Sequence, residues 1–360
     1  MDPTNPTTST NSKTLLITGG CGFIGSHFIR LVARERPDWR VINVDSLTYA
    51  GNLENVADIE AGQTSSGYRF VKADITDARA INALFESKKV DVVINMAAET
   101  HVDRSLLDGA PFLRTNVEGT RVLLEAASRH GVERFLQVST DEVYGSLGPT
   151  SPAFTEQSPL EPNSPYAASK ASADLLARAY YRSFSLPVLV TRCGNNYGSY
   201  QFPEKFLPLF ITNALDDQPL PLYGDGQNIR DWIHVEDHVR ALLRVLEAGV
   251  PGEIYNVGVD QQETNRVMAE RILAILKKPP SLIHYVKDRP GHDRRYALNV
   301  AKIKKELGWE PLTSLEEGLQ ATVDWYRARR VWWEKIKNGE YQDYYRRWYG
   351  ERFEEDFCPE

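Results

Sequence analysis

A tyrosine and a lysine four residues apart, Tyr166 and Lys170, form the pair whose residue types and spacing most clearly suggest chemistry. They follow a turn-rich stretch at 161–165, and residues four apart lie on one face of a helix. A lysine cation beside a phenol stabilises the phenolate and lowers the tyrosine pKa. The pair therefore predicts a base that takes the proton of a hydroxyl group. Because the chain contains 17 tyrosines, such a pair also arises by chance, and its context decides its weight.

Three polar residues, Thr140, Asp141 and Glu142, stand at the end of a predicted strand at 134–140. The threonine can hydrogen-bond an oxygen that is being oxidised. Oxidation of an alcohol needs no further acid or base, whereas elimination of water needs a base beside the new ketone and an acid for the departing hydroxyl. At neutral pH that acid stays protonated only through burial or a carboxylate neighbour. The acid pair therefore favours elimination; two solvated loop acids are the alternative interpretation.

Three glycines, Gly19, Gly22 and Gly25, connect a predicted strand at 14–18 to a predicted helix at 23–35. Glycine permits the tight turn and lets the backbone approach a diphosphate, whose charge the helix N-terminus binds. The spacing G-x-x-G-x-x-G is a variant of the dinucleotide-binding fingerprint. The sequence therefore predicts a dinucleotide site at this turn.

Two acids at the ends of the following strands refine the cofactor prediction. Asp45 ends a strand at 41–45, where a carboxylate accepts hydrogen bonds from the adenosine ribose hydroxyls and repels a 2′-phosphate, which favours NAD over NADP. Asp74 ends the next strand and is predicted to reach the adenine, with a helix-capping or turn residue as the alternative. The other predicted cofactor-site residues are Phe23, Ile24, Ile75 and Ala97, together with Tyr166 and Lys170.

The elements that position these residues alternate along the chain. Predicted strands lie at 14–18, 41–45, 68–74, 91–99, 134–140, 186–192 and 253–258, and predicted helices at 23–35, 116–130 and 233–248. Apolar strands separated by helices indicate a parallel sheet covered on both faces. The sequence thus predicts an α/β fold with a doubly wound Rossmann sheet and a smaller, mixed α/β C-terminal substrate domain.

The domain boundaries are predicted from a change in composition. Prolines and aromatic residues become dense after residue 193, and the strand–helix alternation weakens. We assign 13–192 plus 229–256 to a NAD-binding domain and 193–228 plus 257–360 to a substrate domain. Residues 1–12 are predicted to be a disordered tail.

The bulk composition argues against several classes of protein. A net charge of -7 over 360 residues argues against a nucleic-acid partner. No apolar run has the length of a membrane span, so no membrane partner is expected. The three cysteines lack metal-ligand spacing, which indicates a reduced, cytoplasmic protein without a metal site. A basic, aromatic segment at 326–350 is interpreted as a capping helix and tail rather than as an RNA-binding element.

Taken together, the motifs resemble those of the dTDP-glucose 4,6-dehydratases, a family of the extended short-chain dehydrogenase/reductase superfamily. The resemblance covers about residues 13–350. It rests on GGCGFIGSH (19–27), VDSLTYAGNL (44–53), AAETHVDRS (97–105), STDEVYG (139–145), SPYAASKASAD (164–174), NNYGSYQFPEKFLP (195–208), RDWIHVEDHVRAL (230–242) and RPGHDRRYA (289–297). It implies a NAD-dependent lyase of deoxysugar biosynthesis.

The resemblance implies a role for each catalytic candidate. Tyr166 is the base and Lys170 its partner when hydride leaves C4 of the glucose in dTDP-glucose, and Thr140 assists through a hydrogen bond. Glu142 takes the C5 proton, and Asp141 protonates the C6 hydroxyl as it leaves. Hydride then returns to C6, which yields dTDP-4-keto-6-deoxy-glucose and regenerates NAD.

The resemblance also implies the substrate site and the assembly. The nucleotide-sugar candidates are Asn196, Glu204, Lys205 and Tyr223, and the diphosphate and nucleotide candidates are Arg230, Asn265, Arg289 and His292. Arginine suits a diphosphate because its planar fork donates two parallel hydrogen bonds. His101 and His234 are interpreted as structural histidines. Relatives dimerise through two helices per subunit, here one ending near His130 and one beginning at Tyr166, so we expect a homodimer.

Three alternatives stay open at this point. A nucleotide-sugar 4-epimerase shares the fold, the cofactor, Tyr166 and Lys170, but does not need the pair Asp141 and Glu142. A dehydratase of UDP-glucose would differ only in the nucleobase, which residue chemistry does not decide. A non-catalytic NAD-binding scaffold would have little reason to keep these residues together.

Overall fold

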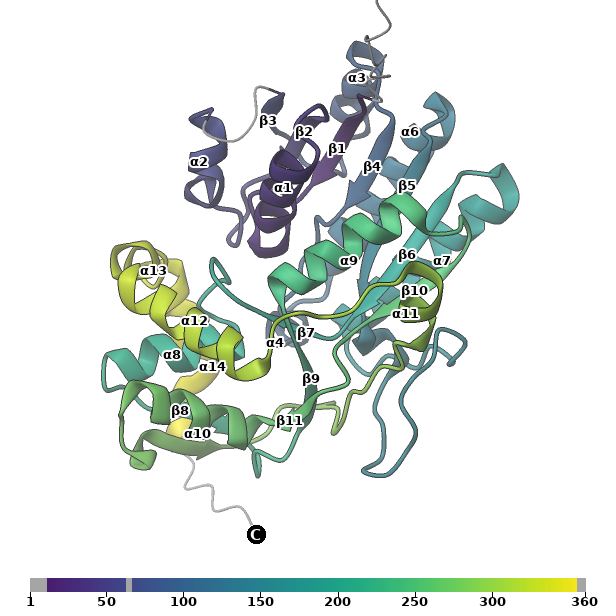
Figure 1. The fold of residues 1–360 in the computed structure, drawn as a ribbon. Helices are drawn as coiled ribbons and strands as arrows, with labels where there is room; N and C mark the ends of the chain where they lie inside the picture. Colours follow the sequence, from purple (N-terminus) through teal and green to yellow (C-terminus); the bar gives the residue numbers. More distant parts are fainter. Residues whose placement is uncertain (1–11, 63–66, 355–360) are drawn as a thin grey trace, which may run out of the picture.

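Runs of aliphatic and β-branched residues form the central sheet of the computed structural model, which describes residues 12–62 and 67–354. Within these residues seven strands, each parallel to its neighbours, lie in the order β10–β6–β5–β4–β1–β2–β3 (Figure 1). Their bounds are β1 Thr14–Thr18, β2 Arg40–Asp45, β3 Tyr68–Lys72, β4 Val92–Asn95, β5 Arg134–Thr140, β6 Val188–Cys193 and β10 Ile254–Val257. The strand order reverses between β1 and β4, where doubly wound sheets form a ligand crevice. The predicted α/β fold with a Rossmann sheet is confirmed.

Helices cover both faces of this sheet, because successive strand residues point to opposite sides. One face packs against α1, α9 and α11, and its core includes Leu15 and Ile17 of β1. The other face packs against α3, α6 and α7, and Leu16 is buried there. The bounds are α1 Phe23–Glu35, α3 Ala78–Ser87, α6 Thr120–His130, α7 Pro165–Phe184, α9 Val235–Ala248 and α11 Ala301–Leu307.

A smaller body with its own hydrophobic core lies beyond the carboxyl ends of these strands (Figure 1). In the described residues it holds a sheet in the order β11–β9–β7 and the parallel pair β12–β8. These strands are β7 Asn195–Tyr197, β8 Leu220–Tyr223, β9 Ile229–His234, β11 Gln262–Thr264 and β12 Ile283–Val286. Its helices are α8 Phe206–Leu215, α10 Asn265–Leu276, α12 Leu315–Ala328, α13 Arg330–Ile336 and α14 Glu340–Glu354. Short helices complete the chain: α2 Ala57–Glu60, α4 Val102–Leu107, α5 Ala110–Phe112, and 3-10 turns at Leu53–Val56, Asp141–Tyr144 and Pro280–Leu282.

Some predicted strands are shorter in the structure. The strands predicted at 68–74 and 91–99 end at Lys72 and Asn95, because the residues that follow turn away from the sheet and line a cavity. The helix predicted at 233–248 begins two residues later, since its first two residues pair within β9.

The helix predicted at 116–130 is divided, with a π-helical turn at Leu113–Gly119 before α6. The amide of Asn116 donates hydrogen bonds to the Glu99 carbonyl (3.0 Å) and the Ser169 hydroxyl (2.8 Å). Its oxygen accepts from the Glu99 backbone N–H at 2.9 Å. The wide turn therefore ties α7 to the segment after β4, and π-helical turns often occur at functional sites.

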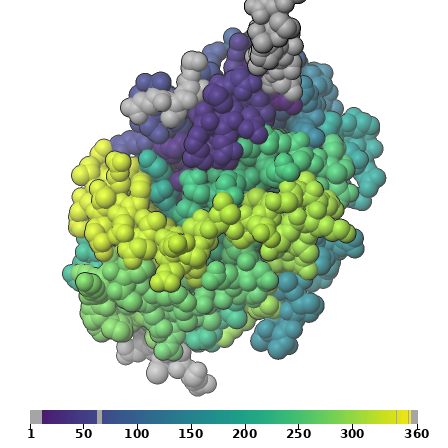
Figure 2. Space-filling view, in the orientation of Figure 1, coloured from purple at the N-terminus to yellow at the C-terminus, as the bar shows by residue number. Residues whose placement is uncertain are grey.

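The C-terminal segment predicted as a capping helix and tail is instead part of the smaller core. Trp332, Trp333, Trp348 and Tyr349 are buried there, since large aromatic side chains gain most from leaving water. The Trp332 indole N–H donates to the Asn55 side chain at 3.1 Å. The C-terminal helices thus lie against the N-terminal part of the chain, as Figure 2 shows.

The division into two domains at the predicted boundaries stays a proposal. Residues 229–234, assigned to the NAD-binding domain, form β9 of the smaller body. Residues 298–309, assigned to the substrate domain, pack into the core of the large sheet through Ile303 and Leu307. Residues 1–11 of the predicted tail lie outside the described residues.

Candidate active site

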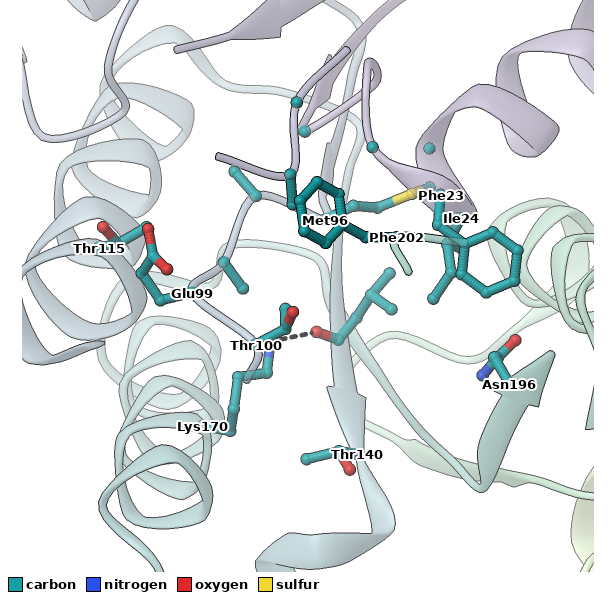
Figure 3. Close-up of a pocket in the computed structure, with 18 of the residues that line it drawn as sticks. Phe23, Ile24, Met96, Glu99, Thr100, Thr115, Thr140, Lys170, Asn196 and Phe202 are labelled. Atoms are coloured by element: carbon teal, nitrogen blue, oxygen red, sulfur yellow. Dashed lines mark hydrogen bonds between the residues drawn. The ribbon is translucent and has the colours of Figure 1, made fainter. Parts of the chain in front are cut away.

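A cavity of about 310 Å³ opens at the carboxyl ends of β1, β2, β4, β5 and β6. All predicted cofactor and catalytic residues line it: Gly19, Gly22, Phe23, Ile24, Gly25, Asp45, Asp74, Ile75, Ala97, Thr140, Asp141, Glu142, Tyr166 and Lys170. Figure 3 shows Phe23, Ile24, Met96 and Phe202 on one side of this space, with Lys170 and Thr140 on another. The sheet therefore brings residues from distant parts of the sequence to one crevice.

The glycine turn leaves room that no other residue would leave. Gly19 has φ +71°, in the left-handed region, and a Cβ on Gly25 would lie 2.3 Å from the Gly19 carbonyl oxygen. Among the described residues no side chain caps α1 at Gly22, and no acid stands in its first turn. The first N–H groups of α1 are thus available to an anion at the cavity, which fits the diphosphate of a dinucleotide.

Gly25→Ala is expected to lose most of the bound NAD and to unfold at a lower temperature. The added methyl meets backbone, and forced overpacking costs about 1–3 kcal/mol. NAD released on denaturation and the thermal midpoint measure both effects. Gly109→Ala is the control, because its Cβ would find an ordinary contact of 3.5 Å. Normal NAD content in Gly25→Ala would contradict this account of the turn.

Asp45 and Asp74 both line the cavity and both stabilise loops. The Asp45 carboxylate accepts hydrogen bonds from the backbone N–H groups of Cys21 (2.9 Å) and Leu47 (2.8 Å). Burial raises its pKa despite these bonds. Asp74 accepts from the N–H and hydroxyl of Thr76, each at 2.8 Å, which is the turn role considered above. Each Asp45 oxygen keeps a second lone pair for a ligand hydroxyl or amine, and so does Oδ2 of Asp74, since both bonds from Thr76 go to Oδ1.

Helix α7 carries Tyr166 and Lys170 into the cavity. Ser164 caps it by accepting from the Ala167 N–H at 3.1 Å, and proline at the first position favours a helix start there. The Lys170 ammonium donates to the Val138 carbonyl at 2.7 Å. Burial lowers the pKa of Lys170, and burial together with Glu142 raises that of Tyr166 well above its ordinary value. Among the protein's own groups, burial therefore dominates the pKa of Tyr166, and the lowering expected from Lys170 together with an oxidised nicotinamide stays a prediction.

The acids Asp141 and Glu142 follow β5 in a tight turn, where the Thr140 hydroxyl accepts from the Glu142 N–H at 3.3 Å. Burial, and then the charge of Glu142, raise the pKa of Asp141 well above its ordinary value. Burial also raises the pKa of Glu142, but the cations Arg289 and Arg230 oppose that rise. These causes favour the protonated form of Asp141, and the two arginines favour the ionised form of Glu142.

A second cavity of about 160 Å³ adjoins the first and shares Glu142, Glu204 and Lys205 with it. Its lining includes the other predicted substrate residues except Asn196, namely Tyr223, Arg230, Asn265, Arg289 and His292; Asn196 lines the first cavity. With Lys205, the arginines Arg230 and Arg289 place three cationic side chains around this cavity, although the chain has a negative net charge. The cations thus lie where an anionic ligand next to Glu142 would sit.

Several of these side chains have partners within the protein. The Lys205 ammonium donates to the Thr100 carbonyl at 2.6 Å. Glu204 accepts from Arg104 Nε at 2.9 Å and is buried. The Asn196 oxygen contacts His238 Nδ1 at 2.9 Å, and burial lowers the pKa of His238 to about 3, so this histidine is neutral.

Sequence reasoning missed a group of residues that follow β4: His101, which was interpreted as structural, and Asp103 line the second cavity, and Arg104 pairs with Glu204 in its wall. Arg104 lies between the rings of Tyr49 and Tyr344, 4.2 Å from each centroid. The available signal was the position of these residues, because residues after a central strand end face the crevice.

The described residues hold no group of three or more His, Cys, Asp or Glu side chains arranged to bind a metal ion. Among the helices in this part of the chain, none combines the length and the apolar composition that a membrane crossing requires.

A Rossmann sheet with a glycine turn, a Tyr–Lys pair on α7 and a cationic second cavity defines an enzyme of the short-chain dehydrogenase/reductase type. Residues 16–322 match the family model for GDP-mannose 4,6 dehydratase. Curated dTDP-glucose 4,6-dehydratases from Neisseria meningitidis serogroup B and an Actinoplanes species are 47% and 50% identical. These alignments cover 92% and 89% of this chain and 98% and 99% of the relatives.

Solved structures give the same result. A dTDP-glucose 4,6-dehydratase from Streptomyces venezuelae, solved with NAD, has a TM-score of 0.86 and 51% identity over 90% of this chain and 100% of its own. The structure of a dTDP-glucose 4,6-dehydratase from Bacillus anthracis, also solved with NAD, has a TM-score of 0.84 and 48% identity. This match covers 91% of this chain and 100% of that one. A UDP-glucose 4-epimerase from Thermotoga maritima has a TM-score of 0.80 but only 32% identity. This match covers 88% of this chain and 99% of that one. The chain belongs to the dTDP-glucose 4,6-dehydratase family, which confirms the resemblance.

Proposed function

We propose that this protein dehydrates dTDP-glucose to dTDP-4-keto-6-deoxy-glucose with NAD as its cofactor, without net oxidation. The observation that carries the proposal is the acid pair of Asp141, which is buried, and Glu142, which is half-buried; both line the same cavity as Tyr166. Burial and the charge of Glu142 raise the pKa of Asp141 and favour its protonated form, while Arg289 and Arg230 favour the ionised form of Glu142; elimination of water needs both forms.

The residues at the glycine turn, together with Asp45, would hold NAD, which when bound accepts hydride from C4 of the sugar and returns it to C6. Tyr166 removes the proton of the C4 hydroxyl, and the Thr140 hydroxyl orients that oxygen. Glu142 then removes the C5 proton, made acidic by the C4 ketone, and Asp141 gives its proton to the departing C6 hydroxyl. The buried side chains exclude water, which would otherwise compete for these protons.

The second cavity would hold the nucleotide half of the substrate. Its cations Lys205, Arg230 and Arg289 suit a diphosphate, and Arg289 and Arg230 also stabilise the charge of Glu142. The family relationship supports dTDP rather than UDP as the nucleotide.

Product analysis tests the proposed function. Purified protein with catalytic NAD is incubated with dTDP-glucose, and the sugar is followed by NMR. A 4-keto-6-deoxy product supports the dehydratase, whereas a galactose-configured product would identify an epimerase. Turnover of UDP-glucose alone would contradict the nucleotide assignment.

The pH profile of kcat/KM is predicted to be bell-shaped. Both limbs should lie at higher pH than the ordinary pKa values of Glu and Asp would give. Burial raises the pKa of Glu142 above 4.5, so the base is lost as pH falls through that raised value. Burial and Glu142 raise the pKa of Asp141 well above 3.8, so the acid is lost only as pH rises through that higher value. Both apparent values belong to the coupled pair. Initial rates at constant ionic strength measure the profile, and full activity retained to pH 4.5 would contradict a base with a raised pKa.

We further propose a homodimer built on α6 and α7. These helices pack side by side, and the exposed Leu175 of α7 (56%) and Leu113 of the π-helical turn before α6 (58%) offer apolar surface typical of an interface. Leu175→Glu should give a monomer in light scattering, while Leu312→Glu, at another exposed leucine (77%), should leave the mass unchanged. A dimeric Leu175→Glu protein would place the interface elsewhere.

We also propose a cytoplasmic location, which the family relationship supports; fractionation of the producing cells tests it.

A further inference from the structure

Asp103 is a buried carboxylate in the wall of the second cavity, and the proposed reaction gives it no task. It lies on α4, and its side chain is 7% exposed. One of its oxygens accepts from Arg289 Nη1 at 3.1 Å, and the other accepts from the Tyr223 hydroxyl at 2.8 Å. Arg289 and Tyr223 both come from the smaller body, so Asp103 joins the two parts of the chain at the cavity.

The C-terminal helix α14 completes this network. The Trp348 indole N–H donates to the Tyr223 hydroxyl. The Tyr349 hydroxyl lies 3.2 Å from the same oxygen, and the two tyrosine rings are stacked. A hydroxyl has one hydrogen, so Tyr223 donates to Asp103 and accepts from α14. The hydrogen bonds therefore run in one direction, from Trp348 through Tyr223 to Asp103.

Asp103 is ionised in this setting. Burial raises its pKa, but the charge of Arg289 and the hydrogen bond from Tyr223 outweigh that effect and hold the pKa below its ordinary value. A fixed negative charge beside a diphosphate site weakens the attraction of the ligand. Its presence is explained if it orients a cation. An arginine has five N–H donors, and Asp103 takes one of those of Arg289, which leaves others for a ligand.

We propose that Asp103, held through Tyr223 by helix α14, is a positioning residue that orients Arg289 for the diphosphate of the nucleotide sugar. This inference rests on the proposed function, which makes Arg289 a diphosphate contact. The diphosphate is bound alike in the ground state and the transition state. Loss of the orientation therefore acts mainly on KM, and on kcat only through the charge that Arg289 places near Glu142.

Asp103→Asn distinguishes a positioning residue from a residue that only reduces the positive charge, because the two roles predict opposite changes in dTDP affinity. With Arg289 no longer oriented, dTDP binding to the NAD-loaded enzyme weakens about 10- to 100-fold, as expected for a lost charge-assisted contact. KM for dTDP-glucose rises in parallel and by a larger factor than kcat falls. If the carboxylate only reduces the positive charge, its removal tightens dTDP binding. Unchanged or tighter binding in calorimetry would overturn the proposal.

Asp237→Asn is the matched control. Asp237 is also buried and paired with an arginine, Arg240, and it accepts from the Leu312 and Thr313 N–H groups away from both cavities. It should lower the thermal midpoint and leave the dTDP dissociation constant unchanged. A loss of dTDP affinity there would show that Asp103→Asn reports general destabilisation.

Trp348→Phe tests the same network without touching the carboxylate or lining the cavity. It removes the N–H that orients Tyr223, so dTDP binding should weaken in the same direction, about threefold or more. If Asp103→Asn does not fold, unchanged binding in Trp348→Phe overturns the proposal. If the wild-type enzyme binds UDP and not dTDP, the nucleotide assignment has failed. The same variants titrated with UDP then decide the positioning role.

Discussion

Glu142→Gln is expected to lower kcat for dehydration of dTDP-glucose by about 10³-fold, within the range for loss of a general base. The amide fills the same space but cannot accept the C5 proton. The alcohol step does not need Glu142, so hydride can still leave C4. We therefore expect the absorbance of reduced nicotinamide to rise after mixing with substrate while the 4-keto-6-deoxy product fails to form. Stopped-flow absorbance and product NMR measure the two steps.

Glu86→Gln is the control for this substitution. Glu86 is an exposed acid on α3, outside both cavities, and its amide variant should have wild-type kcat and KM. Wild-type turnover in Glu142→Gln would show that the acid pair does not perform the elimination. It would then act only through its charge on neighbouring groups.

Tyr166→Phe is expected to lower kcat by about 10²- to 10⁴-fold and to block the reaction one step earlier. Without the phenol oxygen nothing takes the C4 hydroxyl proton, so no reduced nicotinamide should form. The ring stays, and with it the contact to Phe112, so the fold and the NAD content should be preserved. Absorbance after mixing with substrate therefore distinguishes this variant from Glu142→Gln.

Tyr180→Phe, on the same helix, is the matched control, because Tyr180 packs against Phe184 away from the cavity. It should react at the wild-type rate. Accumulation of reduced nicotinamide in Tyr166→Phe would assign the C4 proton to another base. Glu142 would be the first candidate, since it lines the same cavity.

The sheet and its turn were predictable because their signals are local. The apolar run at 14–18, the three glycines and Asp45 stand close together in sequence, and the structure reproduces both the strand and the start of α1. The start of α7 was equally local, since Ser164 caps the helix whose first turn holds Tyr166.

The remaining features depend on contacts between distant segments. Lys170 donates a hydrogen bond to the Val138 carbonyl, and burial is the main cause that raises the Tyr166 pKa. Both depend on how the chain packs and not on the spacing of residues in the sequence. The C-terminal segment looked like a solvated helix because its charges are frequent. Its tryptophans are buried because the smaller body offers them a core. Nothing in the sequence around Asp103 indicated that it pairs with Arg289, which lies 186 residues away.

The transfer of one hydrogen tests the central claim most directly. dTDP-glucose deuterated at C4 is converted by the enzyme with catalytic NAD, and the product is examined by NMR. The account predicts a 4-keto-6-deoxy sugar with the deuterium at C6, because the hydride taken from C4 returns within the same site. Deuterium found at C4 of a galactose-configured sugar would contradict the elimination and make the protein an epimerase.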